Sequence, residues 1–140
     1  AEAASQGRYP SRRRFRVLGM PPPKNPAQRL RDILDNIDLV EAFTSGLEYR
    51  VFQSDRKTVY AVVRALEIIS EATRRLPDEL KLRYPEIDWV AIAAAGNIYR
   101  HEYEGVDEAL IWYTARSGTQ ALRGMAAAEL ERLDSSKVQD

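Results

Sequence analysis

The stretch "RKTVYAVVRALEIISEATRRL", residues 56–76, decides the fold class of this chain. Apolar residues recur in it at spacings of three and four, which places them on one broad face of an α-helix. This face consists of Val59, Val62, Val63, Leu66, Ile69, Ala72 and Leu76. Ser54 or Asp55 is suited to cap the start of the helix, and Pro77 ends it. A helix with so wide an apolar face is stable only when it packs against neighbours.

Three further long helices are predicted around this one. "NPAQRLRDILDNIDLVEAFTSG", residues 25–46, begins with an Asn25 cap and Pro26, and its apolar face is Leu30, Ile33, Leu34, Ile37 and Val40. Asp88 caps a helix over 89–103, whose small residues from Ala91 to Gly96 allow close approach of a neighbour. The last helix runs from about Asp107 to about Leu133, weakened by Gly118. Residues 77–87 are predicted to form a short helical turn and a connector between the second and third helices. No stretch alternates as a strand would, so the fold class is all-α, an up-and-down bundle of four main helices.

Composition indicates one domain and excludes several classes of protein. The 140 residues suffice for one core, and no apolar run is long enough to span a membrane. There is no cysteine, which excludes disulfides and thiol catalysis and fits a cytoplasmic protein. Five arginines precede Met20, and we interpret 1–24 as a leader that is disordered or not native, 25–134 as the domain and 135–140 as a tail. After residue 19, 16 basic residues face 20 acidic ones, so any basic surface for nucleic acid must be local.

The chemistry of the chain centres on "GNIYRHEYEGVD", residues 96–107, which holds the single histidine. His101 suits proton transfer at neutral pH, and the adjacent Arg100 suits binding of a phosphate. Together they fit metal-free cleavage of an RNA phosphodiester, although a lone histidine near a helix end is more often a surface residue. With one histidine and no cysteine, no metal site is predicted. Glu67 and Glu71 form a ladder with Arg64, which from spacing alone is a solvated face.

A resemblance to a known family changes this balance. "RALEIISEA", "YPEIDW" and "NIYRHEY", together with the helices that flank them over roughly 27–130, resemble the HepT-like toxins of the HEPN (higher eukaryotes and prokaryotes nucleotide-binding) superfamily. The resemblance implies a homodimeric helical bundle that cleaves cellular RNA, tRNA among it, without a metal or cofactor. It also implies the toxin half of a type VII-like toxin–antitoxin pair, neutralised by a nucleotidyltransferase that transfers AMP to a tyrosine.

The family pattern places an arginine before an asparagine, a histidine and a tyrosine. In this chain Asn97 matches the asparagine, His101 the catalytic histidine and Tyr103 the tyrosine that is modified. Gly96 stands where the family has the arginine. The nearest substitute is Arg100.

Three interpretations follow. The first is a ribonuclease in which Arg100 replaces the family arginine, supported by Glu71 or Glu67. The second is a degenerate HEPN domain that binds RNA or the nucleotidyltransferase without cleavage. The third is a structural helical dimer whose polar cluster is an interface network.

Overall fold

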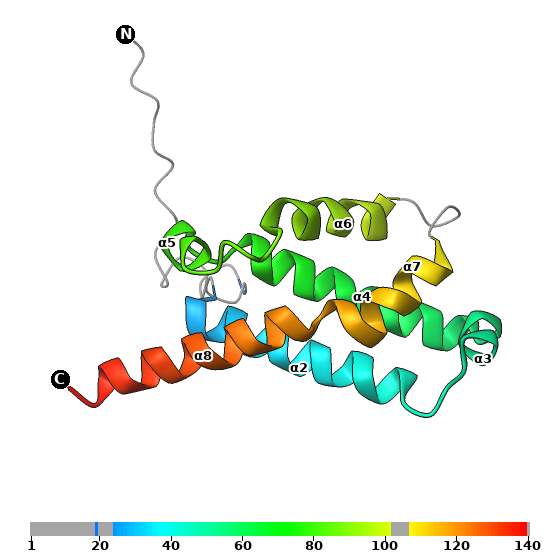
Figure 1. The fold of residues 1–140 in the computed structure, drawn as a ribbon, viewed down its shortest axis with the longest axis horizontal. Helices are drawn as coiled ribbons and strands as arrows, with labels where there is room; N and C mark the ends of the chain where they lie inside the picture. Colours follow the sequence, from blue (N-terminus) through cyan, green and yellow to red (C-terminus); the bar gives the residue numbers. More distant parts are fainter. Residues whose placement is uncertain (1–18, 20–23, 102–106, 140) are drawn as a thin grey trace, which may run out of the picture.

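A computed structural model describes residue 19, residues 24–101 and residues 107–139, with only the backbone of His101 (Figure 1). All regular structure in these ranges is helical, which confirms the predicted all-α class. The long helices are α2 (Pro26–Thr44), α4 (Arg56–Arg74), α6 (Trp89–His101) and α8 (Gln120–Lys137). None of the helices within the described ranges is long and apolar enough to cross a membrane.

The first two long helices begin where their caps predict. Asn25 accepts a hydrogen bond from the backbone of Gln28, whose side chain in turn accepts from the backbone of Asn25. Asp55 accepts from the backbone N–H of Thr58 at the start of α4. The predicted apolar faces of both helices are buried or packed against the core. Periodicity and capping therefore located these two helices correctly.

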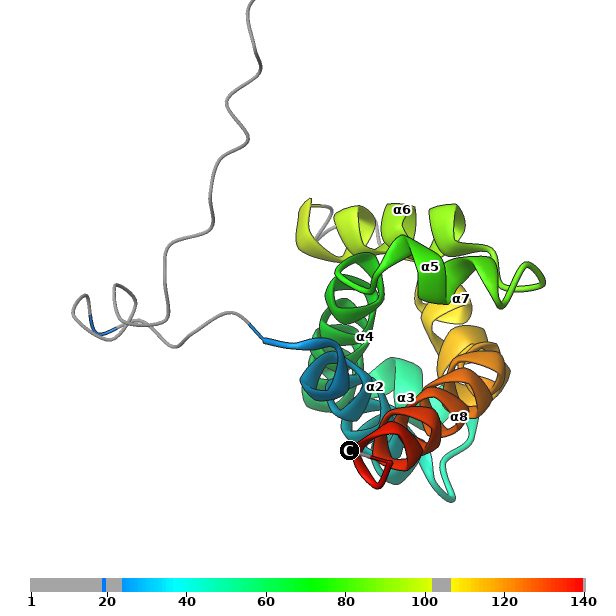
Figure 2. The same cartoon turned by 90° about the vertical axis from the view of Figure 1, so that its left-hand side faces the viewer.

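The long helices run alternately up and down and enclose a shared core (Figures 1 and 2). Helix α2 lies between α4 and α8, and α6 packs on α4. The core contains fully buried Leu30, Ile33 and Ile37 from α2, with Val62 from α4 and Met125 from α8 at 0 to 1% exposure. In Figure 1, α6 lies above α4, and these two helices carry the predicted site residues that the structure describes.

The predicted last helix, expected to be weakened at Gly118, is not one regular α-helix. The segment divides into α7 (Glu108–Tyr113), a π-helix η1 (Thr114–Gly118) and α8, which runs on to Lys137, beyond the predicted domain end at 134. The hydroxyls of Thr114 and Ser117 donate to the carbonyls four residues earlier, a bond that competes with regular helix geometry. Arg116 donates to the carbonyl of Thr44, so the wide turn also reaches the end of α2.

Two short helices fill the ends of the bundle. Helix α3 (Tyr49–Ser54), which the sequence patterns do not predict, buries Phe52 completely against the ring of Trp112, with the ring centres 5.0 Å apart. Helix α5 (Asp78–Leu82) is the predicted helical turn. Both are held by single buried side chains, Phe52 and Leu80, and not by their own length.

A polar contact, here called the clasp, joins the connector after α5 to α8. Arg83 donates to both carboxylate oxygens of Glu129, at 3.1 and 2.7 Å, and the hydroxyl of Tyr84 donates to the same carboxylate at 3.0 Å. Glu129 is only 3% exposed. Hydrogen bonds from Arg83 hold the pKa of Glu129 below its ordinary value, against the opposing effect of burial. The clasp thus satisfies one buried charge with two partners.

Candidate functional site

The site begins with an unusually close approach of α4 and α6, here called the seam. Ser70 of α4 is buried and donates a hydrogen bond of 2.7 Å to the carbonyl of Ile92 in α6. A Cβ atom added at Gly96 would lie 2.2 Å from the Oγ and 2.9 Å from the Cβ of Ser70. The two helices can pack this closely only because residue 96 has no side chain. Among the small residues predicted to allow a close approach, Gly96 is the one at which the structure shows it.

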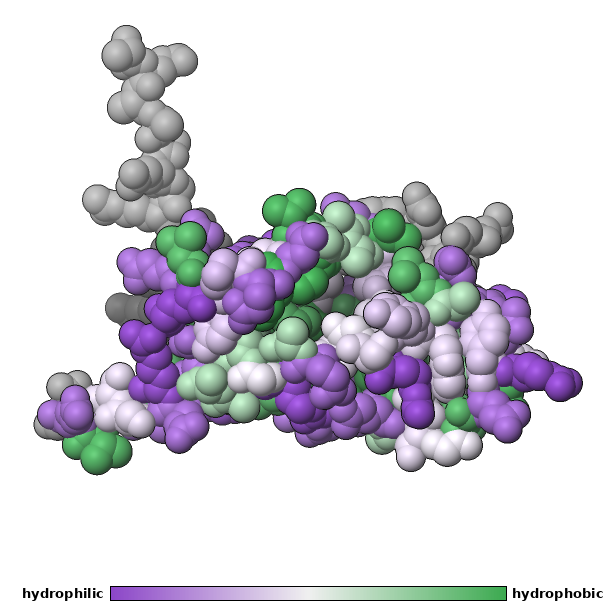
Figure 3. Space-filling model, in the orientation of Figure 1, coloured by the Kyte–Doolittle hydropathy of each residue, from purple (hydrophilic) through white to green (hydrophobic). Residues whose placement is uncertain are grey.

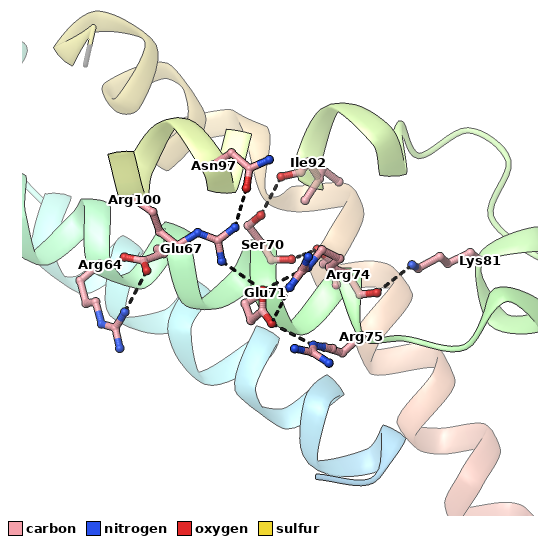
Figure 4. A network of polar contacts seen from close by, with 11 residues as sticks. Arg64, Glu67, Ser70, Glu71, Arg74, Arg75, Lys81, Ile92, Asn97 and Arg100 are labelled. Atoms are coloured by element: carbon pink, nitrogen blue, oxygen red, sulfur yellow. Dashed lines mark hydrogen bonds and ion pairs between the residues drawn. The ribbon is translucent and has the colours of Figure 1, made fainter. Parts of the chain in front are cut away.

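Arg100 lies one turn further along α6 and turns back onto α4 (Figure 4). Its guanidinium donates to Asn97 Oδ1 at 2.6 Å and to Glu71 Oε2 at 3.3 Å. The arginine side chain is 30% exposed, so one side is held by the protein while the other reaches solvent. Three residues predicted from sequence as site residues are thereby brought into one cluster. The side chain of Arg100 has a fixed place that the sequence alone left open.

Glu71 is the centre of this cluster. It pairs with Arg74 at 3.1 Å and Arg75 at 2.9 Å on its own helix, and with Arg100 across the seam. Burial alone would raise the pKa of Glu71, but hydrogen bonds from Arg74 and Arg75 and their charges outweigh it and lower that pKa to about 2. The carboxylate is therefore ionised at any pH where RNA cleavage is measured. The negatively charged Glu71 holds the guanidinium of Arg100 in place.

The predicted ladder of Arg64, Glu67 and Glu71 is only partly formed. Arg64 pairs with Glu67 at 3.2 Å, and the arginine is 68% exposed, as expected of a solvated face. Glu71 instead directs its oxygens toward Arg74, Arg75 and Arg100. Of the two supporting residues predicted, Glu71 contacts Arg100, while Glu67 contacts Arg64.

Residues 33–128, well over half of the chain, match the family described as "Ribonuclease HepT-like". The chain belongs to this HepT-like ribonuclease family. A protein of Thermococcus cleftensis named "Probable ribonuclease HepT" is 40% identical over 95 residues, which are 68% of this chain and 86% of that protein. A protein of Methanocaldococcus jannaschii named "Putative RNase MJ1216" is 38% identical over 87 residues, covering 62% of this chain and 72% of that protein. No solved structure matches the chain.

Within the HepT-like pattern, His101 is the final residue of α6, directly after Arg100. The His101 side chain lies outside the described part of the structure, as does the whole of Tyr103. Their predicted roles as catalytic and modified residues therefore stay predictions. Tyr99, four residues before Tyr103 in the sequence, is only 7% exposed, and burial raises the pKa of its phenol. Tyr99 packs in the core and anchors the last turn of α6.

The resemblance predicts an arginine at the position of Gly96, and the seam leaves no room for one. An arginine at 96 would place its Cβ against Ser70, a buried side chain fixed by its bond to Ile92. The helices would have to separate to admit it. Sequence reasoning identified the replaced arginine but missed Ser70, because its contact with Gly96 joins residues far apart in the chain.

The cluster at the end of α6 can hold and neutralise an anion. Arg100 is fixed by Glu71 and Asn97, and a guanidinium has five N–H donors, of which these two contacts use two. The remaining donors can bind phosphate oxygens in the bidentate geometry that suits arginine. A cation held in this way can bind an anionic group such as a phosphate.

Proposed function

We propose that this chain is a metal-independent endoribonuclease in which Arg100 has taken over the work of the arginine missing at Gly96. The observation that carries the proposal is the anchoring of Arg100 by Asn97 and Glu71, one residue before His101. Membership in the HepT-like ribonuclease family supports the same activity. Glu71 is a positioning residue in this scheme, because it acts through Arg100.

The proposed reaction is an internal displacement at phosphorus. The ribose 2′-oxygen forms a bond to phosphorus and gives its proton to a basic imidazole. The bond from phosphorus to the 5′-oxygen breaks as that oxygen takes up a proton from water. His101 moves the proton, Asn97 orients the attacked group, and Arg100 faces the extra negative charge of the phosphorane. The products are a 2′,3′-cyclic phosphate and a free 5′-hydroxyl, so atoms and charges balance without a metal.

The biological setting proposed is the toxin half of a toxin–antitoxin pair. The substrate is cellular RNA, with tRNA the first to test, and the active form is a homodimer in which α6 helices face each other. Val90 and Ile98 of α6 are 81% and 42% exposed, which supports pairing through this helix. Figure 3 shows apolar residues gathered over α6 and α7, above a more polar lower side. The antitoxin is a nucleotidyltransferase that transfers AMP to Tyr103, placing a charged group beside His101.

The direct test is cleavage of total tRNA by the purified protein without added metal. We expect His101→Ala to abolish cleavage and Arg100→Ala to reduce its rate about a hundredfold, since each loses a group that acts in the transition state. Arg31→Ala, on the exposed side of α2, is the matched control and should cleave normally. Mass spectrometry must first show the protein free of AMP. Partner enzyme with ATP should then add one AMP to the chain and none to Tyr103→Phe.

A second function, favoured by the contact of Gly96 with Ser70, is binding without cleavage. In this alternative the loss of the family arginine leaves a domain that binds RNA or the nucleotidyltransferase. AMP-free protein that binds RNA but leaves tRNA intact would support this alternative and contradict the ribonuclease.

A further inference from the structure

A small polar cleft opens beside the site, between the start of α2, the middle of α4 and the end of α6. Its volume is about 150 Å³. Its walls carry four basic side chains: Lys24, Arg29, Arg64 and Arg100. They also carry three acidic ones: Asp32, Glu67 and Glu71. The cleft is therefore lined mainly by charge, with one more cation than anions.

The pairing of these charges leaves one arginine over. Lys24 pairs with Asp32, Arg64 with Glu67, and Arg100 with Glu71. Arg29 is partly buried, and no side chain within the described ranges pairs with its guanidinium. Its position in the wall of a cleft reduces its contact with water, while the carboxylates of the cleft are paired with other cations. A ligand that carries negative charge would complete this site.

The arrangement of the basic side chains favours a phosphate group that belongs to a longer chain. Arginine binds phosphate through two parallel N–H donors, and a cleft of this volume can admit a phosphate group. Beyond the cleft, Arg74 and Arg75 continue the row of cations along α4, at 50% and 46% exposure (Figure 4). A polyanion can follow such a row, whereas a single small anion would use only one position.

We infer that this cleft binds a backbone phosphate of the RNA strand, next to the phosphate that is cleaved, with Arg29 as its anchor. Arg64 also lines the cleft and contributes a second arginine. The cleft shares Arg100 with the catalytic cluster, so the phosphate it holds belongs to a nucleotide beside the scissile bond. The inference rests on the proposed function in taking RNA as the ligand. It makes Arg29 a binding residue and leaves the chemistry to the groups on α6.

The first measurement is binding of a single-stranded RNA that cannot be cleaved because every 2′-hydroxyl carries a methyl group. Fluorescence anisotropy over a range of salt gives both Kd and its salt dependence. We expect Arg29→Gln to weaken binding about tenfold and to reduce the slope of log affinity against log salt by about 0.7, the value for one phosphate contact on a single strand. Arg31→Gln removes the same charge from the same helix outside the cleft and should change neither value appreciably.

Cleavage kinetics separate this inference from the proposed function. Arg29→Gln should raise KM for RNA about tenfold and leave kcat nearly unchanged, unlike His101→Ala, which loses kcat. If Arg29→Gln matches Arg31→Gln in Kd, salt slope and KM, the inference is wrong while the ribonuclease stands. If the protein never cleaves RNA but Arg29→Gln still weakens binding, the ribonuclease is wrong while the cleft stands. If inorganic phosphate stabilises the protein against thermal unfolding while Arg29→Gln leaves RNA binding unchanged, the cleft is a small-anion site. That result would overturn the assignment to RNA.

Discussion

Two carboxylates in this protein are surrounded by basic side chains, Glu129 in the clasp and Glu71 at the seam, and they do different work. Glu129 is 3% exposed and uses both oxygens on a single arginine, with Tyr84 completing the contact. Glu71 has a side chain 31% exposed and gathers three arginines around one charge. The clasp is balanced and closed. The seam has more positive than negative charge and is open to solvent, which suits a ligand that brings negative charge.

The largest effect expected is on the clasp. Arg83→Met leaves the Glu129 carboxylate buried with Tyr84 as its only partner, and a buried charge without its ionic partner is strongly unfavourable. We expect the midpoint of thermal unfolding, followed by circular dichroism, to fall by about 10 °C. Arg74→Met is the matched change at the seam and should shift it by only about 2 °C, since Glu71 keeps two other arginines and water. Equal shifts for the two variants would contradict the contrast between the clasp and the seam.

The next effect concerns the packing of the seam itself. Gly96→Ala introduces a Cβ into contact with Ser70, and overpacking of this kind costs about 1–3 kcal/mol in the free energy of unfolding. Denaturant titration measures it. Gly124→Ala is the control, because a Cβ there meets nothing within 4 Å and alanine is the better helix former. It should stabilise the protein by up to about 1 kcal/mol. If Gly96→Ala were equally stabilising, the close approach of α4 and α6 would be refuted.

The smallest effect is the pH dependence of the seam. Because the pKa of Glu71 is lowered to about 2 in the folded chain, its contribution to stability is present above its ordinary value of 4.5 and is lost as the pH falls toward 2. We expect the stability difference between the unmodified protein and Glu71→Gln to shrink over this window. Unfolding midpoints measured from about pH 6 down to about pH 2.5 would test it. A difference that stays constant across the range would show that Glu71 is not held by its arginines.

How much of the fold could be predicted depended on element length and local signals. Helices α2 and α4 have strong caps and apolar faces of several turns, so their positions follow from the sequence. Helix α3 has six residues, too few to show a period, and it forms because Phe52 is buried against Trp112. The π-helix lies where Arg116 reaches the carbonyl of Thr44, 72 positions away in the chain, and such a contact has no sequence signature.

The candidate site shows the same limit. The family resemblance predicts roles for Asn97 and His101 and an arginine at the position of Gly96, all within one local motif. It could not place the guanidinium of Arg100, because the contact with Glu71 joins two helices at residues 29 positions apart. Sequence patterns also did not identify Arg29, and the reason is similar. Its significance depends on the pairing of the other charges in the cleft, which exists only in the folded chain.

The π-helix between α7 and α8 has a consequence for insertions and deletions. A π turn accommodates an additional residue within an otherwise regular helix, so the helix beyond it keeps its face toward the core. Losing one residue from 114–118 would let this turn close to regular spacing and leave Leu122 and Met125 where they pack. The same loss within 126–128 would turn the rest of α8 by about 100°, and Glu129 would face away from Arg83. The last helical segment can therefore change its length by one residue at the wide turn, but not beside the clasp.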